Sequence, residues 1–237
     1  MPSPLILVPG LMCDADSWQP TLDQLPASVH CHVVDHGQAD SLVTMAQQLL
    51  AQAPERFALA GHSMGGRVAL EVMRIAPERV THLALLDTGY LPKPDGLAGD
   101  AERDKRWALL AIAREQGVRA MATHWVQGMV APHRLNDHAL IDAVLNMFER
   151  KSAALFERQI NALLTRPDGS DVLAHIRIPT LVLCGEADSW SPPAQHQAMA
   201  NLIPAQPPAT VIADAGHMVM MEAPERVAQA MLRWLAA

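Results

Sequence analysis

The sequence predicts an α/β protein built on an open, doubly wound, mostly parallel sheet of six strands with a helical insertion. Three observations carry this prediction. Short, almost continuously apolar runs recur along the 237 residues, helical patterns separate them, and one long helical stretch interrupts the alternation. Strands buried on both faces of a parallel sheet read as unbroken apolar runs, and strands alternating with helices imply crossovers between parallel neighbours. A chain of this length can bury a substantial core as one domain.

The predicted strands are short and apolar. They are 4–8 (PLILV), 30–34 (HCHVV), 57–61 (FALAG), 82–87 (HLALLD), 180–185 (TLVLCG) and 209–214 (ATVIAD). Apolar residues at helical spacing predict helices at about 17–25, 41–53, 64–76, 192–202 and 223–235. Strands and helices therefore alternate along most of the chain.

Residues 89–172 break this alternation. The segment opens with GYLPKPDGLAGD, which is rich in glycine and proline, and continues with stretches such as RWALLAIAREQGVRAMATHWV. Their apolar residues recur at helical spacing, with charges on the opposite face. The sequence thus predicts a core of residues 1–88 and 173–237, and an inserted helical segment, 89–172, that has no core of its own.

Charge and composition narrow the classes of partner. The 18 Lys and Arg residues against 25 Asp and Glu residues give a net charge of −7, and no basic block occurs. Nucleic acids and anionic membranes attract basic patches, so neither is expected as a partner. No uninterrupted apolar run reaches the roughly 18–20 residues of a membrane span. We expect a small-molecule substrate and a monomer or homodimer.

The N-terminus and the cysteines predict a cytoplasmic location. The stretch MPSPLILVPG has no basic residue before its short apolar run, which favours a strand over a signal peptide. Cys13, Cys31 and Cys184 are odd in number, far apart and in or beside apolar segments. They are expected to be free thiols in a reducing compartment.

A single serine lies between glycines in GHSMGG, residues 61–66, where a predicted strand meets a predicted helix. In the G-x-S-x-G pattern the serine occupies the apex of a sharp turn with strained dihedral angles, where side chains two residues away would collide. The positive end of the following helix points at the serine oxygen. Gly61 and Gly65 therefore favour Ser63 as a nucleophile. The alternative is a glycine-rich turn with an incidental serine.

A serine hydroxyl needs a general base at neutral pH, and this is usually a histidine. His217 lies in ADAGHMVMME, after the last predicted strand and before the last helix. A loop at the carboxyl edge of a parallel sheet can reach back over the turn that carries Ser63. His62 adjoins Ser63, but adjacent side chains at such a turn diverge. We therefore predict His217 as the base.

The base in turn needs a carboxylate that holds its tautomer and stabilises the imidazolium. Asp188 ends LVLCGEAD, directly after a predicted strand. Asp87 also follows a strand and is the main rival, whereas Asp214, three residues before His217, is more consistent with a loop cap. The chain order Ser63, Asp188, His217 favours Asp188.

The oxyanion of an acyl-transfer intermediate needs two fixed backbone donors. One predicted donor is the N–H of Met64, the residue after Ser63. The other is the N–H of Leu11, which follows Pro9-Gly10 in the loop after the first strand. The alternative reading of Pro-Gly is a simple turn.

No metal or cofactor is predicted. His30, His32 and His36 lie close together in the sequence, but no Cys or carboxylate cluster accompanies them. The chain also lacks a dinucleotide-binding fingerprint and a P-loop.

Taken together, these residues resemble the α/β-hydrolase superfamily across essentially the whole chain. PGLMCDADSWQPTLDQL is similar to the family's oxyanion loop and first helix, and PTLVLCGEADSWSPP to the region of its acid. The resemblance implies that residues 89–172 form a lid and that Ser63, His217 and Asp188 hydrolyse a carboxylic ester through an acyl-enzyme. Where members of the family frequently have His-Gly after the first strand, this sequence has Pro9-Gly10.

Two other functions remain open. One is a carbon–carbon bond hydrolase or lyase that uses the same triad, of the aromatic-degradation or menaquinone-pathway type. The other is a non-catalytic ligand sensor on the same scaffold. Fold and triad do not separate them, because substrate choice depends on the pocket.

The inserted segment holds the residues that would distinguish substrates. An anionic substrate would be favoured if basic side chains point inward, namely Arg150, Lys151, Arg158 or His124. A neutral ester would be favoured if the inward face is apolar and includes Trp107. The predicted pocket residues are Trp125, Met121, Met129 and Met218.

Overall fold

The computed structural model describes residues 3–237 and contains a single six-stranded sheet. The strands are β1 (Leu5–Val8), β2 (Cys31–Val33), β3 (Phe57–His62), β4 (Val80–Leu86), β5 (Thr180–Gly185) and β6 (Ala209–Ile212). Their order is β2-β1-β3-β4-β5-β6, and every neighbouring pair is parallel. The predicted fold class and all six predicted strands are confirmed.

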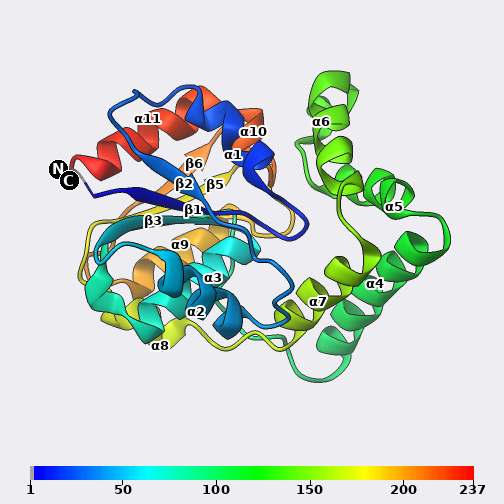
Figure 1. The fold of residues 1–237 in the computed structure, drawn as a ribbon, viewed down its shortest axis with the longest axis horizontal. Coiled ribbons are helices and arrows are strands. Elements are labelled where there is room, and N and C mark those ends of the chain that lie inside the picture. The colour runs from blue at the N-terminus through cyan, green and yellow to red at the C-terminus, as the bar shows by residue number, and fades with distance from the viewer. Residues whose placement is uncertain (1–2) are drawn as a thin grey trace.

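Helices cover both faces of the sheet (Figure 1). One face carries α1 (Ala15–Leu22), α10 (Val219–Glu222) and α11 (Pro224–Leu235). The other carries α2 (Leu42–Gln52), α3 (Met64–Ile75), α8 (Ser170–His175) and α9 (Pro193–Leu202). The central strands β1 and β3 are buried along their whole length, which explains why their sequences are continuously apolar.

The first helix differs from its predicted position at 17–25. It begins two residues earlier, because the Asp14 side chain accepts a hydrogen bond from the Asp16 N–H and caps the helix. It ends at Leu22, before Asp23. The short helix α10, directly after His217, was not predicted; its four residues are too few to give a periodic signal.

Between β4 and β5 the chain forms four further helices, which we call the insertion helices: α4 (Gly96–Glu115), α5 (Val118–Trp125), α6 (His138–Glu149) and α7 (Ala153–Leu164). They stand to one side of the sheet, at the right in Figure 1. Short 3-10 turns occupy Val126–Gly128 and Pro132–Asn136, and a third, Pro77–Arg79, precedes β4. The helical nature of this segment agrees with its sequence pattern.

The exact division at residue 172 stays a prediction. Helix α8 begins at Ser170, inside the segment expected to belong to the insertion, yet it packs against α3 and α9 of the core. Arg74 of α3 donates to the Asp171 carboxylate at 2.8 Å. No helix in residues 3–237 has the length and apolar character that would let it cross a membrane.

Candidate active site

Ser63 occupies the turn between β3 and α3 with a backbone conformation that few residues other than glycine adopt. Its φ is 54° and its ψ is −117°. Such a conformation costs on the order of 1–3 kcal/mol and persists only where the surroundings enforce it. The turn is also too tight for side chains, because a Cβ on Gly61 would collide with the Gly65 carbonyl and one on Gly65 with the Val8 carbonyl.

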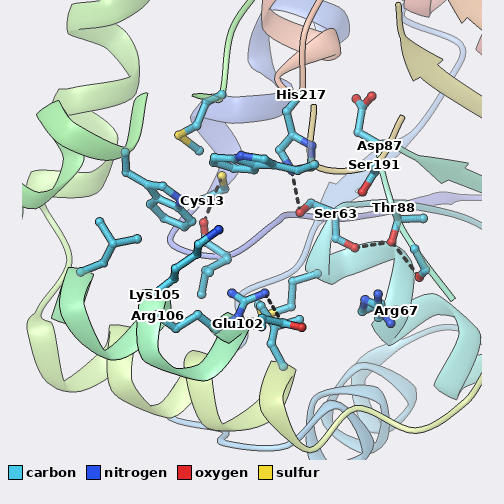
Figure 2. A pocket seen from close by; sticks show the side chains of 18 of the residues that line it. Cys13, Ser63, Arg67, Asp87, Thr88, Glu102, Lys105, Arg106, Ser191 and His217 are labelled. Atoms are coloured by element: carbon cyan, nitrogen blue, oxygen red, sulfur yellow. Dashed lines mark hydrogen bonds and ion pairs between the residues drawn. The ribbon is translucent and has the colours of Figure 1, made fainter. Parts of the chain in front are cut away.

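The turn brings Ser63 into a chain of hydrogen bonds with two residues from distant loops. Ser63 Oγ lies 2.9 Å from Nε2 of His217, and Nδ1 of His217 lies 2.9 Å from Oδ2 of Asp188. Figure 2 shows the first of these contacts. The other oxygen of Asp188 accepts the backbone N–H groups of Trp190 at 2.9 Å and Ser191 at 3.0 Å. The carboxylate is therefore held by three donors.

The surroundings of Asp188 favour its charged form. Burial by itself would raise the pKa of this carboxyl group. The positive charge that His217 can carry, its hydrogen bond and the two backbone N–H groups outweigh the burial, so the pKa of Asp188 is lowered. Asp188 is thus an ionised acceptor for the His217 N–H at neutral pH.

Asp87, the rival carboxylate, lies nearby but makes no hydrogen bond to His217 within the part of the chain that the structure describes. Its Oδ1 accepts the Gly185 N–H at 2.8 Å, and its Oδ2 is buried without a partner. Burial, followed by the negative charge of Asp188, raises the pKa of Asp87 well above its usual value. The structure therefore places Asp188, and not Asp87, against the imidazole.

His62 supports the loop of His217. Its Nε2–H donates to the backbone oxygen of His217 at 2.8 Å, and burial, aided by His217, lowers the pKa of His62 to about 3. Nε2 of His62 also lies 4.0 Å from Oδ2 of Asp87. Because the pKa of His62 lies far below neutral pH, its imidazole is uncharged there and this approach is not an ion pair.

Two backbone N–H groups flank Ser63 without an acceptor. Leu11 and Met64 both line the cavity beside Ser63, and within residues 3–237 neither N–H donates a hydrogen bond. The loop of Leu11 is fixed from the insertion side, since the next N–H, of Met12, donates to Oε1 of the buried Gln159 on α7 at 2.8 Å. These two groups are available to a developing oxyanion.

A buried carboxylate anchors the loop of His217. Oε1 of Glu222 accepts the N–H groups of Gly216 at 3.0 Å and Met218 at 3.2 Å, one on each side of His217. Oε2 accepts the Ala131 N–H at 2.8 Å, which ties the same loop to the insertion. Sequence reasoning missed Glu222; its place five residues after His217 gave no signal because its partners are backbone groups.

We expect Glu222→Gln to lower both stability and turnover. The glutamine nitrogen has no lone pair to offer the backbone donors, so at least one buried N–H loses its acceptor, at a cost of about 1–3 kcal/mol. A loosened His217 should reduce kcat by between about tenfold and a hundredfold. Urea unfolding and ester kinetics test this, with the exposed Glu225→Gln as matched control. Equal stability of the two variants would contradict the anchoring role.

The residues described above open into a cavity of about 680 Å³. Its size lies in the range typical of small-molecule sites. Aromatic rings line the part of the cavity next to His217. The ring centroid of Trp190 lies 4.8 Å from that of His217 and 5.5 Å from that of Trp125, on which Trp190 is stacked. Of the predicted pocket residues, Trp125 and Met129 line this cavity.

The predictions of Met121 and Met218 as pocket residues are corrected by the structure. Both are fully buried and lie outside the cavity lining. Met121 is one turn before Trp125 on α5, within the packing of α5 against α4 and α6. Met218 directly precedes α10 and is part of the hydrophobic core, although its backbone neighbour His217 contacts Ser63.

The basic residues that line the cavity are not those singled out in the sequence. Arg150 and Lys151 pair with Asp14, Arg158 reaches the Gln38 carbonyl, and His124 is exposed. The cavity is lined instead by Arg67, Lys105, Arg106 and Arg166. The sequence could have indicated Arg67, because it lies four residues after Ser63, one turn along the predicted helix. The positions of the other three side chains depend on how the insertion folds.

The described residues also contain no group of three or more His, Cys, Asp or Glu side chains arranged to hold a metal. His36, one of the three clustered histidines, instead lies with Nε2 3.1 Å from the Pro9 carbonyl oxygen.

The family comparison agrees with the fold and with the geometry of the site. The α/β hydrolase family profile matches residues 5–230, so the chain belongs to the α/β hydrolase family. It is a hydrolase, and several of the proteins that it resembles are named esterases or hydrolases.

Among known proteins, the chain is similar to hydrolases of two kinds. The chain is 28% identical to a pimeloyl-[acyl-carrier protein] methyl ester esterase of Edwardsiella ictaluri over 237 residues, 93% of this chain and 88% of that protein. A protein of that name from Vibrio atlanticus is 39% identical over 97 residues, which span only 38% of this chain and 33% of that protein. A putative carbamate hydrolase, RutD, of Azorhizobium caulinodans is 27% identical, with 85% and 80% covered.

Among solved structures, the chain is similar to a thermophilic esterase from Thermogutta terrifontis, described with malate bound. The TM-score is 0.84 at 29% sequence identity, and the match covers 99% of this chain and 89% of the esterase.

Proposed function

We propose that this protein is a serine hydrolase that cleaves carboxylic esters of small or medium-sized substrates. Ser63 is the nucleophile, His217 the general base and Asp188 the residue that orients and stabilises the base. The observation that carries the proposal is the hydrogen-bonded series Ser63–His217–Asp188, with both contacts at 2.9 Å and with Ser63 held at a φ of 54°. A strained serine bonded to a carboxylate-paired histidine is the arrangement of an activated nucleophile.

The first half of the reaction forms an acyl-enzyme. Ser63 Oγ attacks the ester carbonyl carbon while its proton moves to Nε2 of His217. The carbonyl oxygen becomes an oxyanion, for which the N–H groups of Leu11 and Met64 are the donors. The carbon–oxygen bond to the alcohol then breaks, and His217 returns its proton to the departing alkoxide.

The second half repeats these steps with water. His217 removes a proton from water, the hydroxide adds to the acyl carbon, and collapse of the intermediate breaks the bond to Ser63. The proton on His217 returns to Ser63 Oγ, and the carboxylic acid leaves. Asp188 stays ionised throughout and accepts the Nδ1–H of the imidazolium.

The choice of an ester is supported by the relatives. Three of the four compared proteins are named esterases, and the fourth is a putative carbamate hydrolase. The insertion helices act as a lid, a role supported by the residues of α4, α5 and α7 that line the cavity. A cytoplasmic location is supported by three thiols that are all free.

Labelling with a fluorophosphonate, followed by a substrate panel, tests the function. We expect covalent modification of Ser63, identified by mass spectrometry of the labelled peptide, and turnover of carboxylic esters in a panel that also holds thioesters and ring-cleavage diketones. Turnover of the diketones alone would reassign the enzyme to carbon–carbon bond hydrolysis. Absence of both labelling and turnover would leave a ligand sensor.

A further inference from the structure

Four basic side chains gather on one side of the active-site cavity, in a protein whose net charge is −7. We call Arg67, Lys105, Arg106 and Arg166 the basic wall. Arg67 comes from α3, Lys105 and Arg106 come from α4, and Arg166 follows α7. Figure 2 shows the first three on the opposite side of Ser63 from His217. Positive charge is thus concentrated where a substrate would bind.

One carboxylate, Glu102, compensates part of this charge. Arg166 donates to its two oxygens at 2.7 and 2.8 Å, and Nη2 of Arg106 lies 3.0 Å from Oε1. Burial alone would raise the pKa of Glu102, but Arg166 and Arg106 lower it to about 2. Glu102 is therefore ionised and shared between two guanidinium groups, which leaves the wall with an excess of positive charge.

Arg67 has no such partner. Its Nη1 donates to the Leu91 carbonyl at 2.9 Å, and within residues 3–237 it forms no ion pair and no other side-chain hydrogen bond. Burial lowers the pKa of Arg67 to about 9, and the positive charges of Arg166 and Arg106 add to this effect. A partly buried guanidinium with unused donors is costly unless something pairs with it.

The backbone leaves room for this guanidinium. A Cβ on Gly89 would lie 2.7 Å from Nη2 of Arg67 and 2.6 Å from Nε2 of Gln195, so a side chain at this position would displace these two donors. Both side chains line the cavity. Lys105, exposed and without an ion pair in the described chain, adds a mobile charge on the same side. Hydrogen-bond donors of Arg67, Gln195 and Lys105, which come from three different helices, therefore line the same cavity.

The wall is close to the proposed nucleophile. The backbone N–H of Arg67 donates to the Ser63 carbonyl at 3.4 Å, so the two residues are one helical turn, about 6 Å of rise, apart. Apolar side chains of Leu109, Ile112 and Leu163 also line the cavity. A ligand that reaches both places would combine an ester, a short apolar stretch and an anion.

We infer that the preferred substrates are esters that carry an anionic oxygen group, a carboxylate or a phosphate, remote from the scissile carbonyl, with Arg67 as its principal partner and Lys105 as an additional charge. This inference rests on the proposed function and names the substrate class of that site. The planar fork of a guanidinium matches two oxygens of such an anion, and charge-assisted bonds of this kind are stronger than neutral ones.

Matched ester pairs test the inference kinetically. On the acyl side, monomethyl adipate is compared with methyl hexanoate and with methyl ω-phosphonopentanoate. On the alcohol side, γ-acetoxybutyrate is compared with butyl acetate and with the corresponding phosphonate. We expect kcat/KM to be at least about tenfold higher for one anionic ester than for its uncharged partner. The preferred anion distinguishes a carboxylate from a phosphate substrate.

Substitutions then locate the preference. Arg67→Met should reduce the ratio of anionic to neutral kcat/KM by about tenfold or more, mainly through KM, and Arg67→Lys should restore part of it. The matched control is Arg103→Met on α4, an exposed arginine that pairs with Asp100 and Asp104 outside the cavity; it should leave the ratio unchanged. Thermal unfolding checks that each variant is folded.

Calorimetry with Ser63→Ala separates this inference from the proposed reaction. The variant should bind the preferred anionic ester at least about tenfold more tightly than its neutral partner, and adding Arg67→Met should remove the difference. If wild type turns over no ester but this binding preference holds, the proposed function fails and the anion site stands. A ratio near one in every pair, or an equal loss for both members in Arg67→Met, overturns the inference.

Discussion

Ser63→Ala is expected to abolish ester hydrolysis and leave the fold intact, with a loss on the order of 10⁴–10⁶ in kcat. The loss should be this large because, among the described residues, Ser63 Oγ is the only hydroxyl oxygen within hydrogen-bond distance of Nε2 of His217. Within residues 3–237, the only thiol that lines the cavity is that of Cys13. Burial, with a further contribution from Asp14, raises its pKa to about 12, so it carries almost no thiolate at neutral pH.

His217→Ala should cost about as much, because nucleophile and base act as a unit. His62 does not replace it, since its Nε2 is bonded to the His217 carbonyl oxygen and its low pKa makes it a weak base.

The Ser63→Ala fold should persist because alanine keeps the Cβ and the same backbone constraint. Hydrolysis of a p-nitrophenyl ester gives the rate, and circular dichroism melting gives the stability. The exposed Ser28→Ala is the matched control, with unchanged activity. More than about 1% of wild-type kcat in a folded Ser63→Ala, far above the range given above, would remove Ser63 from the mechanism.

The second large effect is expected from Asp188→Asn, set against Asp87→Asn. In Asp188→Asn the oxygen can still accept the Trp190 and Ser191 N–H groups, so the amide nitrogen turns toward Nδ1 of His217. Two N–H groups cannot face each other, and the imidazole must place its proton on Nε2, toward Ser63. That tautomer cannot act as a base, and the corresponding change in a serine protease lowers kcat by about 10⁴.

Asp87→Asn should change kcat by less than about threefold, well under 1 kcal/mol. Asparagine retains the oxygen that accepts the Gly185 N–H, and among the described residues the carboxylate bonded to His217 belongs to Asp188, not to Asp87. The stability comparison has a definite sign. Because the folded pKa is raised, the protonated carboxyl stabilises the fold at low pH and this contribution is lost as pH rises through the folded pKa.

Asp87→Asn should therefore be more stable than wild type at alkaline pH, as measured by urea unfolding across a pH series. The two variants also decide between the rival acids. A large loss of kcat in Asp87→Asn together with a harmless Asp188→Asn would transfer the acid role to Asp87.

Much of the fold could be predicted because its signals are local. Each strand is a short run buried on both faces, and the helices of the core alternate with the strands as the apolar spacing indicates. Where a predicted helix boundary was wrong, a single side-chain contact explains the difference: α1 starts two residues before its predicted position because Asp14 caps it. The predicted members of the site that meet in the structure, Ser63, His217 and Asp188, all follow directly on strands or strand loops, whose carboxyl ends converge at one edge.

The pocket could not be predicted to the same degree, because its residues lie on helices whose facing depends on long-range packing. Met121 and Trp125 are one turn apart on α5, yet only Trp125 reaches the cavity, whereas Met121 is fully buried in the core. Glu222 and Gln159 hold the two active-site loops through backbone N–H groups, a contact that leaves no trace in residue spacing.

The sheet, the glycine-flanked turn and the order of the three polar residues follow from the amino-acid sequence, because backbone propensity and burial act over a few neighbouring positions. Which carboxylate meets His217 and which charges face the cavity depend on long-range packing. Asp87 and Asp188 follow the adjacent strands β4 and β5, but only the Asp188 side chain is directed at the His217 ring, whereas Asp87 accepts the Gly185 N–H. Likewise Arg150 and Lys151 pair with Asp14. Arg67, four residues after Ser63, lines the cavity and forms no ion pair within residues 3–237.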